Sequence, residues 1–287
     1  FVKYEFWGNC ITMLREKNVP VYLISAIFRP DQVFFKPWGG QFRRILQAYT
    51  HIFVQDERSA ELLRGIHVTD VTVAGDTRFD RVSDIMATHK NLPEIEAFAA
   101  SAPFTIIIGS SWPQDEDVYI PWLHAHPDVK AICAPHEFDG ARLEAMLEKF
   151  GKGACLYSRY ISEHLSPDTV KYLIIDCFGL LSSLYGYGDT AYVGGGFGAG
   201  IHNINEAAVY AIPVVFGPRH SKFKEAADLI ASGGGFAIDG RPACDTVLDK
   251  IYSDTEARQS AGMIAGEYIK KNLGATKRIY KYIFNND

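Results

Sequence analysis

The sequence contains no run of eighteen apolar residues and no Cys-x-x-Cys pair. The first absence excludes a bilayer-spanning helix within the sequence, because a crossing needs about 20 mostly apolar residues. The five cysteines are odd in number and widely spread, which favours neither a disulfide framework nor a zinc site and fits a reducing cytoplasm. An initiator Met is also absent, and we expect a segment to be missing upstream.

The chain has little net charge for its length. A net charge of −5 over 287 residues argues against a general nucleic-acid-binding protein. The apolar fraction of 47% and the charged fraction of 22% are ordinary for a globular protein. A chain of this length can form two hydrophobic cores, so we expect two domains.

One glycine-rich stretch dominates the sequence. The apolar run 191–193 predicts a buried strand, and five glycines follow it within seven positions. Asn203 and Glu206 then have the spacing of a helix capping box, with Ala207, Ala208 and Ala211 continuing the helical pattern. A helix start there favours a phosphate, and the Glu206 carboxylate suits sugar hydroxyls. The alternative is that Glu206 only caps the helix of an ordinary α/β domain.

Strands and helices alternate along the rest of the chain, which predicts an α/β fold with parallel sheets. The first set of predicted strands is 1–7, 21–24, 51–54 and 71–73, with helices at 9–17, 42–48 and 57–64. The second set is 104–108, 129–134, 172–175, 191–193 and 214–216. Its helices are predicted at 116–125, 141–150, 180–185, 203–211, 226–232, 244–252 and 256–271. We therefore expect a domain of residues 1–82, which looks like half of a Rossmann-type domain, and a second domain of residues 83–287.

Three polar clusters directly follow predicted strands. They are Ser110-Ser111, His136-Glu137 and the stretch from Gly195 to Glu206. Ligands bind beyond the carboxyl ends of the strands in parallel α/β sheets. We therefore expect all three clusters to face one crevice.

These motifs resemble those of the 3-deoxy-D-manno-octulosonic acid (Kdo) transferases, a family of GT-B glycosyltransferases. The family has a Gly-Gly loop, then His-Asn-x-x-Glu, then a Gly-Pro-His-like turn. The corresponding segments here are Gly194-Gly195-Gly196, His202-Asn203-Ile204-Asn205-Glu206 and Gly217-Pro218-Arg219-His220. The family's Gly-Ser-Thr turn is similar to Gly109-Ser110-Ser111, its Pro-Arg-His segment to Pro135-His136-Glu137, and its Gly-Asn-x-Lys-Phe-Asp to Gly75-Asp76-Thr77-Arg78-Phe79-Asp80.

The chain departs from the family pattern at several positions. The Arg of Pro-Arg-His is absent, Ala207 replaces a Pro, and Gly8 stands where Pro is usual in a motif that Tyr4-Glu5-Phe6-Trp7-Gly8-Asn9 resembles. Family members also carry a membrane anchor and a further half domain with the catalytic carboxylate, which find no counterpart here. The resemblance thus implies a GT-B-like fold with an incomplete N-terminal domain, and a chain that is inactive alone.

The resemblance implies transfer of Kdo from CMP-Kdo to a lipid A precursor, with inversion and without a metal. CMP-Kdo is then the donor substrate, no cofactor is needed, and the enzyme acts at the cytoplasmic face of the bacterial inner membrane. No catalytic residue is assigned within the chain. The predicted donor-binding residues are Ser110, Ser111, Pro135, His136, Glu137, Gly195, Gly196, Gly200, His202, Asn203, Glu206, His220 and Lys222.

Within that assignment, Ser110, Ser111 and the glycine backbone suit the phosphate, and Pro135 to Glu137 the cytosine. His202, His220 and Lys222 are expected to add positive charge near the Kdo carboxylate. The polar residues also have simpler interpretations, as turn, loop or surface residues. Two alternative functions stay open: an epimerase of UDP-sugars with the same fold, and a nucleotide-binding module without activity.

Overall fold

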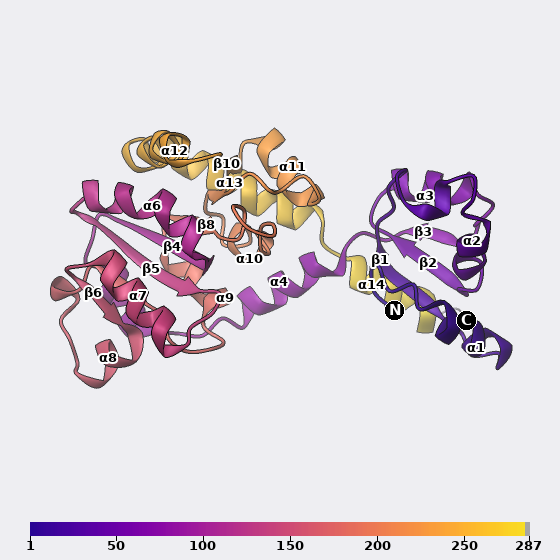
Figure 1. The fold of residues 1–287 in the computed structure, drawn as a ribbon, viewed down its shortest axis with the longest axis horizontal. Helices are drawn as coiled ribbons and strands as arrows, with labels where there is room; N and C mark the ends of the chain where they lie inside the picture. The colour runs from indigo at the N-terminus through magenta and orange to yellow at the C-terminus, as the bar shows by residue number, and fades with distance from the viewer. Residues whose placement is uncertain (285–287) are drawn as a thin grey trace. The chain divides into compact units, whose positions relative to one another are not determined.

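The computed structural model describes residues 1–284, which form two compact units (Figure 1). Unit 1 contains Phe1–Arg81 and the C-terminal segment that begins at Lys271, and unit 2 contains Val82–Lys270. The sequence had assigned the C-terminal segment to the second domain, whereas the structure packs it in unit 1. Among the described residues, no helix combines the length and the apolar content that crossing a bilayer requires.

Unit 1 contains a parallel sheet in the order β1-β2-β3. Its strands are β1 Tyr22–Ala26, β2 His51–Val54 and β3 Val71–Val73. Its helices are α1 Gly8–Glu16, η1 Val33–Phe35, α2 Gly40–Leu46, α3 Glu57–Arg64 and α14 Ala275–Phe284. The predicted strand at 1–7 is wrong: only Val2 forms a bridge, with Ile24, and the Glu5 side chain accepts the Val2 N–H in a turn.

Alternation along β2 gives the sheet of unit 1 two apolar faces. Ile52 and Val54 belong to a core shared with α1, α2 and α3. Phe53 points to the opposite face, where it clusters with Ile279 of α14. The Tyr282 hydroxyl lies 2.9 Å from Nδ1 of His51 on the same face. The C-terminal helix therefore covers a sheet face that the first 81 residues leave open.

Unit 2 contains a seven-stranded parallel sheet in the order β10-β9-β8-β4-β5-β7-β6 (Figure 1). The strands are β4 Phe104–Ser111, β5 Val129–Pro135, β6 Ala154–Leu156, β7 Tyr172–Ile174, β8 Thr190–Val193, β9 Val214–Phe216 and β10 Gly235–Ala237. The predicted α/β class with parallel sheets is confirmed, and β6 and β10 are strands that the sequence did not indicate.

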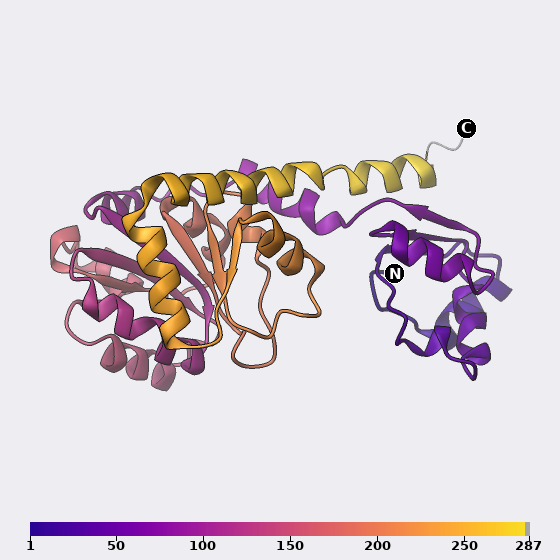
Figure 2. The same cartoon turned by 90° about the horizontal axis from the view of Figure 1, so that it is seen from above.

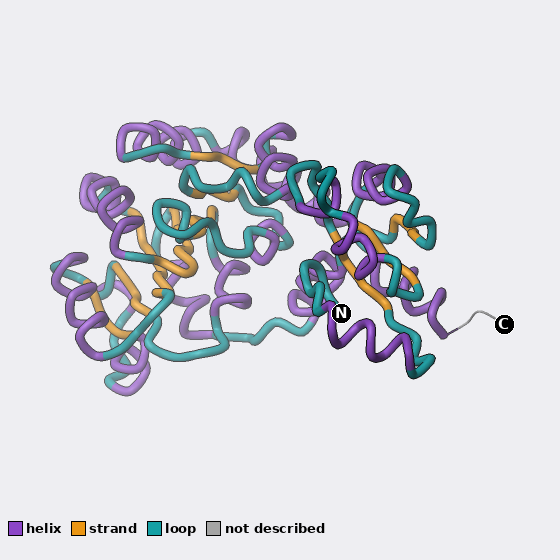
Figure 3. The backbone as a smooth tube through the Cα atoms, turned by 45° about the vertical axis from the view of Figure 1, so that its right-hand side comes forward, coloured by secondary structure: helices purple, strands orange, loops and turns teal. Residues whose placement is uncertain are grey.

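Helices cover both faces of this sheet, and strands alternate with helices along most of the unit (Figure 3). They are α5 Pro93–Ala100, α6 Pro113–Ala125, α7 Gly140–Phe150, α8 Tyr157–Ser162, η2 Pro167–Thr169, α9 Leu181–Leu184, η3 Tyr185–Tyr187, α10 Asn205–Ala208, α11 Lys224–Ser232, α12 Arg241–Ser253 and α13 Thr255–Lys271. The gold helices α12 and α13 meet at a turn (Figure 2).

The core of unit 2 follows from the alternation along its central strand. Ile106 and Ile108 of β4 face a cluster built with α6, α7 and α12, which includes Trp122 and Leu248. Thr105, directly before Ile106 on the chain, points the other way and donates to the carbonyl of Ala99 in α5. Every residue of β4 up to Gly109 is buried, as expected for a strand covered on both sides.

A carboxylate ties α14 into unit 1. Asp80, in α4 Thr77–Ala87, accepts the backbone N–H groups of Gly274 at 2.5 Å and Thr276 at 2.7 Å. Both N–H groups lie at the start of α14, where helix donors have no partner within the helix. Asp80 thus acts as a cap supplied from a residue 194 positions away in sequence.

We expect Asp80→Ala to lower the free energy of unfolding of unit 1 by about 2 kcal/mol, because two charge-assisted hydrogen bonds are lost. Hydrogen exchange should show loss of protection in α14 before the strands. Asp84→Ala, an exposed position on the same helix, is the matched control. Equal protection of α14 in both variants would contradict the capping role.

Candidate functional site

The strand order of unit 2 creates a switch point between β4 and β8. The chain runs from β4 through β5 to one edge of the sheet and later returns to β8 on the other side of β4. The strand ends are aligned, since Gly109 pairs with Val193 and Val193 with Phe216. The loops after these strands therefore leave the sheet at the same edge, where α/β folds bind ligands.

The glycine loop after β8 is held by close backbone contacts. A Cβ added at Gly196 would lie 2.5 Å from the Cα of Gly217, so the loops after β8 and β9 touch through their backbones. Gly195 has a φ of +91°, a conformation that favours glycine. Arg219, beyond β9, donates to the carbonyl of Gly198 and its N–H reaches the carbonyl of Gly196.

A buried carboxylate that the sequence analysis missed organises this loop. Asp115, in the first turn of α6, accepts the N–H of Gly195 at 2.9 Å and the N–H of Trp112 at 3.0 Å. It also accepts the Tyr192 hydroxyl at 3.0 Å. Burial raises the pKa of Asp115, and the three hydrogen bonds oppose that shift. One side chain thus joins the loop after β4 to the loop after β8.

Three aromatic rings from three loops meet at the switch point. Trp112 stacks on His136 with ring centroids 4.4 Å apart, and His136 lies 4.5 Å from His202. The Trp112 indole N–H lies 3.1 Å from Nε2 of His202. Burial lowers the pKa of His202, and His136 lowers it further. The neutral form of His202 is therefore favoured, in contrast to the positive charge expected of it.

Glu206 and Asn203 lie together, but not as the predicted capping box. Helix α10 is a single turn, and Ile204 rather than Asn203 occupies its N-cap position. The Asn203 amide instead donates to Glu206 Oε1 at 3.0 Å. Burial raises the pKa of Glu206, and this hydrogen bond opposes the shift. The predicted helix over residues 203–211 is therefore wrong in extent, because α10 covers only Asn205–Ala208.

The two serines of the β4 loop differ in their surroundings. Ser111 is buried, and its hydroxyl lies 2.7 Å from the Tyr119 hydroxyl and 3.5 Å from Glu116. Ser110 is partly exposed and has a φ of +52°, which is uncommon outside glycine. The Ser111 hydroxyl therefore points into the protein, whereas Ser110 lies at the surface of the loop.

The remaining predicted donor-binding residues lie around the same edge of the sheet of unit 2, at the carboxyl ends of its strands. Pro135 ends β5 and is buried, while His136 and Glu137 are exposed. His220 packs against Phe216, with ring centroids 5.5 Å apart. Among the described residues, its buried Nδ1 and the buried Oδ1 of Asn203 have no hydrogen-bond partner. Gly200, with a φ of +140°, and the exposed Lys222 complete the set.

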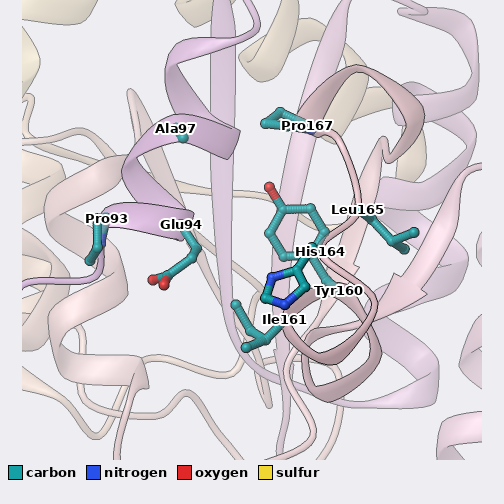
Figure 4. Close-up of a pocket in the computed structure, with 8 residues that line it drawn as sticks. All are labelled: Pro93, Glu94, Ala97, Tyr160, Ile161, His164, Leu165 and Pro167. Carbon is teal, nitrogen blue, oxygen red and sulfur yellow. The ribbon is translucent and has the colours of Figure 1, made fainter.

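A separate pocket of about 380 Å³ lies elsewhere in unit 2, between α5, α8 and η2 (Figure 4). Its wall combines Glu94, Tyr160 and His164 with apolar side chains. The lining residues are Pro93, Glu94, Ala97, Tyr160, Ile161, His164, Leu165 and Pro167. It contains none of the predicted donor-binding residues.

The parallel sheets, the switch point and the glycine loop define an α/β protein of the GT-B type. A solved structure with this fold is UDP-GlcNAc 2-epimerase from Neisseria meningitidis, which aligns with 97% of this chain and 73% of its own, with a TM-score of 0.66 and 14% identity. That likeness establishes the fold alone.

Sequence comparisons find similar proteins in one family. Residues 1–81 match the family model described as 3-deoxy-D-manno-octulosonic-acid transferase (kdotransferase). The 3-deoxy-D-manno-octulosonic acid transferase of Bordetella pertussis is 29% identical over 96% of this chain and 65% of its own length. That of Rickettsia typhi is 24% identical over 77% of this chain and 48% of its own. These matches confirm the predicted resemblance to the Kdo transferase family.

The chain spans about half to two thirds of the length of these relatives. The match to the family model falls on residues that the structure assigns to unit 1. The donor-binding residues predicted from the motifs all lie in unit 2. The match to the family model therefore does not depend on the residues of the candidate site.

We expect Asp115→Ala to lower the free energy of unfolding by about 3–5 kcal/mol, because three buried donors lose their acceptor. Chemical denaturation measures the change. Asp115→Asn keeps one carbonyl oxygen and should cost much less. Asp117→Ala, two residues along α6 with an exposed side chain, is the matched control. Similar small losses for Asp115→Ala and Asp117→Ala would contradict the organising role of Asp115.

Proposed function

We propose that unit 2 binds CMP-Kdo and that the protein transfers Kdo from it to a lipid A precursor, with inversion and without a metal. The resemblance to the Kdo transferases supports Kdo as the transferred sugar. The observation that carries the site is the half-buried pair Glu206 and Asn203 beside the glycine loop at the switch point. A carboxylate and an amide in that position suit the hydroxyls of a ribose.

Hydrogen bonds within the protein narrow the set of groups proposed to bind the phosphate. The Gly195 N–H is donated to Asp115, and the Ser111 hydroxyl is hydrogen-bonded to buried side chains, so neither is assigned to the ligand. The proposed phosphate donors are the Ser110 hydroxyl and the backbone of Gly196 and Gly200. Pro135, His136 and Glu137 are proposed to contact the cytosine, because they follow β5 next to Trp112.

The proposed place of action is the cytoplasmic face of the bacterial inner membrane. The lipid A precursor is a membrane lipid, so its transferase must reach the bilayer surface. Unit 1 exposes Trp7 and Trp38, with relative exposures of 61% and 73%, and such amphipathic rings suit a membrane interface. Phe34, close to Trp38 in sequence, is buried in the core of unit 1 and does not contribute to that surface.

The base that takes the proton from the acceptor hydroxyl is not assigned within this chain. As part of the proposal, the base belongs to a family segment that these residues do not match. As part of the proposal, the chain alone binds CMP without transferring Kdo. Transfer to a lipid A precursor by the 287-residue chain would contradict that part and leave donor binding intact.

Nucleotide selectivity tests the proposed donor. Isothermal titration should show binding of CMP and no binding of UDP-N-acetylglucosamine, because the proposed site recognises cytosine. UMP is the matched control, since it differs from CMP only in the base. Binding of UDP-N-acetylglucosamine with CMP inert would instead favour the epimerase alternative.

Glu206→Gln tests the ribose contact. A charge-assisted hydrogen bond contributes about 1.5–3 kcal/mol, so the variant should bind CMP about ten- to a hundredfold more weakly. The loss should shrink with 2′-deoxy-CMP or 3′-deoxy-CMP, whichever lacks the contacted hydroxyl. Glu256→Gln, at an exposed position of α13, is the matched control.

The pH dependence provides a second readout of the same contact. Because burial raises the pKa of Glu206, its carboxylate takes up a proton at a higher pH than an ordinary glutamate. The preference for CMP over the deoxy analogue should therefore weaken as the pH falls. Comparing the two ligands cancels the titration of their common phosphate. An unchanged preference in Glu206→Gln, with the fold intact by circular dichroism, would remove Glu206 from the site.

A further inference from the structure

The hydrogen bond between Trp112 and His202 determines where the imidazole carries its proton. An indole N–H is only a donor, so the Nε2 atom of His202, 3.1 Å away, must accept. A nitrogen that accepts has no proton of its own. The neutral ring must then carry its proton on Nδ1, because one of the two nitrogens is protonated in a neutral imidazole.

The surrounding contacts hold both rings in this arrangement. The backbone N–H groups of Trp112 and Gly195 both donate to the same oxygen of Asp115, Oδ2. A Cβ at Gly195 would lie 2.9 Å from Cδ2 of His202, so the imidazole packs directly on the glycine backbone. The His202 N–H donates to the carbonyl of Gly194 at 3.2 Å. The donor ring and the acceptor ring are therefore both positioned by groups attached to the same carboxylate.

The Nδ1 atom of His202 is the atom left for a ligand. No described residue is hydrogen-bonded to it. It is also not among the buried atoms of the described chain that have no partner, so it reaches the surface of the site. Burial and the neighbouring His136 both disfavour a second proton on the ring through the lowered pKa of His202.

We propose that Trp112 is a positioning residue that keeps His202 in the Nδ1–H tautomer, so that His202 offers a neutral N–H donor to an oxyanion of the ligand at the glycine loop. The inference rests on the proposed function for the identity of that ligand, a sugar nucleotide with a phosphate and a carboxylate. The oxyanion is either the phosphate or the carboxylate of that ligand. Titrating CMP and free Kdo in separate experiments distinguishes the two.

The tautomer is measured without any ligand. Long-range ¹H–¹⁵N correlation of the uniformly labelled chain, with His202 assigned by loss of its signals in His202→Gln, should show a protonated Nδ1 and an unprotonated Nε2 at neutral pH. In Trp112→Phe, which keeps a ring over His136 but lacks the N–H, Nε2 should become partly protonated. Trp122→Phe is the matched control, because it removes an indole hydrogen bond to Asp249 in the same unit.

Binding measurements test the role of the donor. The Asn side-chain amide nitrogen replaces imidazole Nδ1, whereas that of Gln replaces Nε2. His202→Asn should therefore keep more affinity than His202→Gln for CMP or for Kdo, whichever supplies the oxyanion. Trp112→Phe should weaken the same ligand about three- to tenfold, the range for one neutral hydrogen bond. The ligand that responds identifies the phosphate or the carboxylate.

The outcomes separate this inference from the proposed function. A protonated Nε2 in the wild-type chain, or an imidazolium at neutral pH, would overturn the inference even if CMP binds as proposed. So would equal affinity of His202→Asn, His202→Gln and wild type for both ligands. If the chain binds neither ligand while the tautomer is as expected, the proposed function fails, and the assignment of Trp112 as the residue that sets the tautomer stands.

Discussion

The candidate site depends on the burial of one carboxylate. Asp115 lies in the first turn of α6 and accepts hydrogen bonds from the loop after β4, from β8 and from the glycine loop. A buried carboxylate is costly unless several donors surround it. Here the three donors are the backbone of Trp112, the backbone of Gly195 and the Tyr192 hydroxyl. Loss of the ordered loops would leave the charge unpaired, so the loops and the carboxylate hold each other in place.

Glu116, the next residue of α6, connects the loop after β4 to helix α7. Glu116 is also buried, and it pairs with Arg142 and Lys149 of α7. Ser111 connects the two layers, since its hydroxyl lies near Glu116 and Tyr119. The two consecutive acids thus have separate partners. Asp115 accepts hydrogen bonds from the loops after β4 and β8, and Glu116 pairs with basic side chains of α7. The glycine loop is therefore held by packed secondary structure as well as by the loop after β9.

Sequence periodicity predicted the central strands correctly. It did not predict features that depend on contacts between residues far apart in the sequence. The strands at 51–54 and 214–216 have the predicted bounds, because buried apolar runs between turn residues carry a clear pattern. The edge strand at 71–73 also has its predicted bounds, although its residues are partly exposed. The acids at 115 and 116 have the pattern of a solvated helix start, and only the fold shows their burial. Helix α10 ends early because Ala211, with a φ of +57°, packs against Gly262 of α13. The strands β6 and β10 have three residues each, too few for a reliable pattern.

The charges of the site bear on how it would bind the proposed anionic donor. Its two inner carboxyl groups, on Asp115 and Glu206, both have raised pKa values, and burial lowers the pKa of the inner His202. Positive charge is therefore disfavoured on His202. Cationic groups lie at its exposed rim, where Arg219 is bound to the glycine loop and Lys222 is exposed. Long-range attraction of an anion must then come from the cationic side chains of the rim, because electrostatic forces act over several ångströms when screening by salt is weak. Selection among anions falls to the neutral N–H donors inside, which depend on geometry and therefore on the loops that Asp115 holds together.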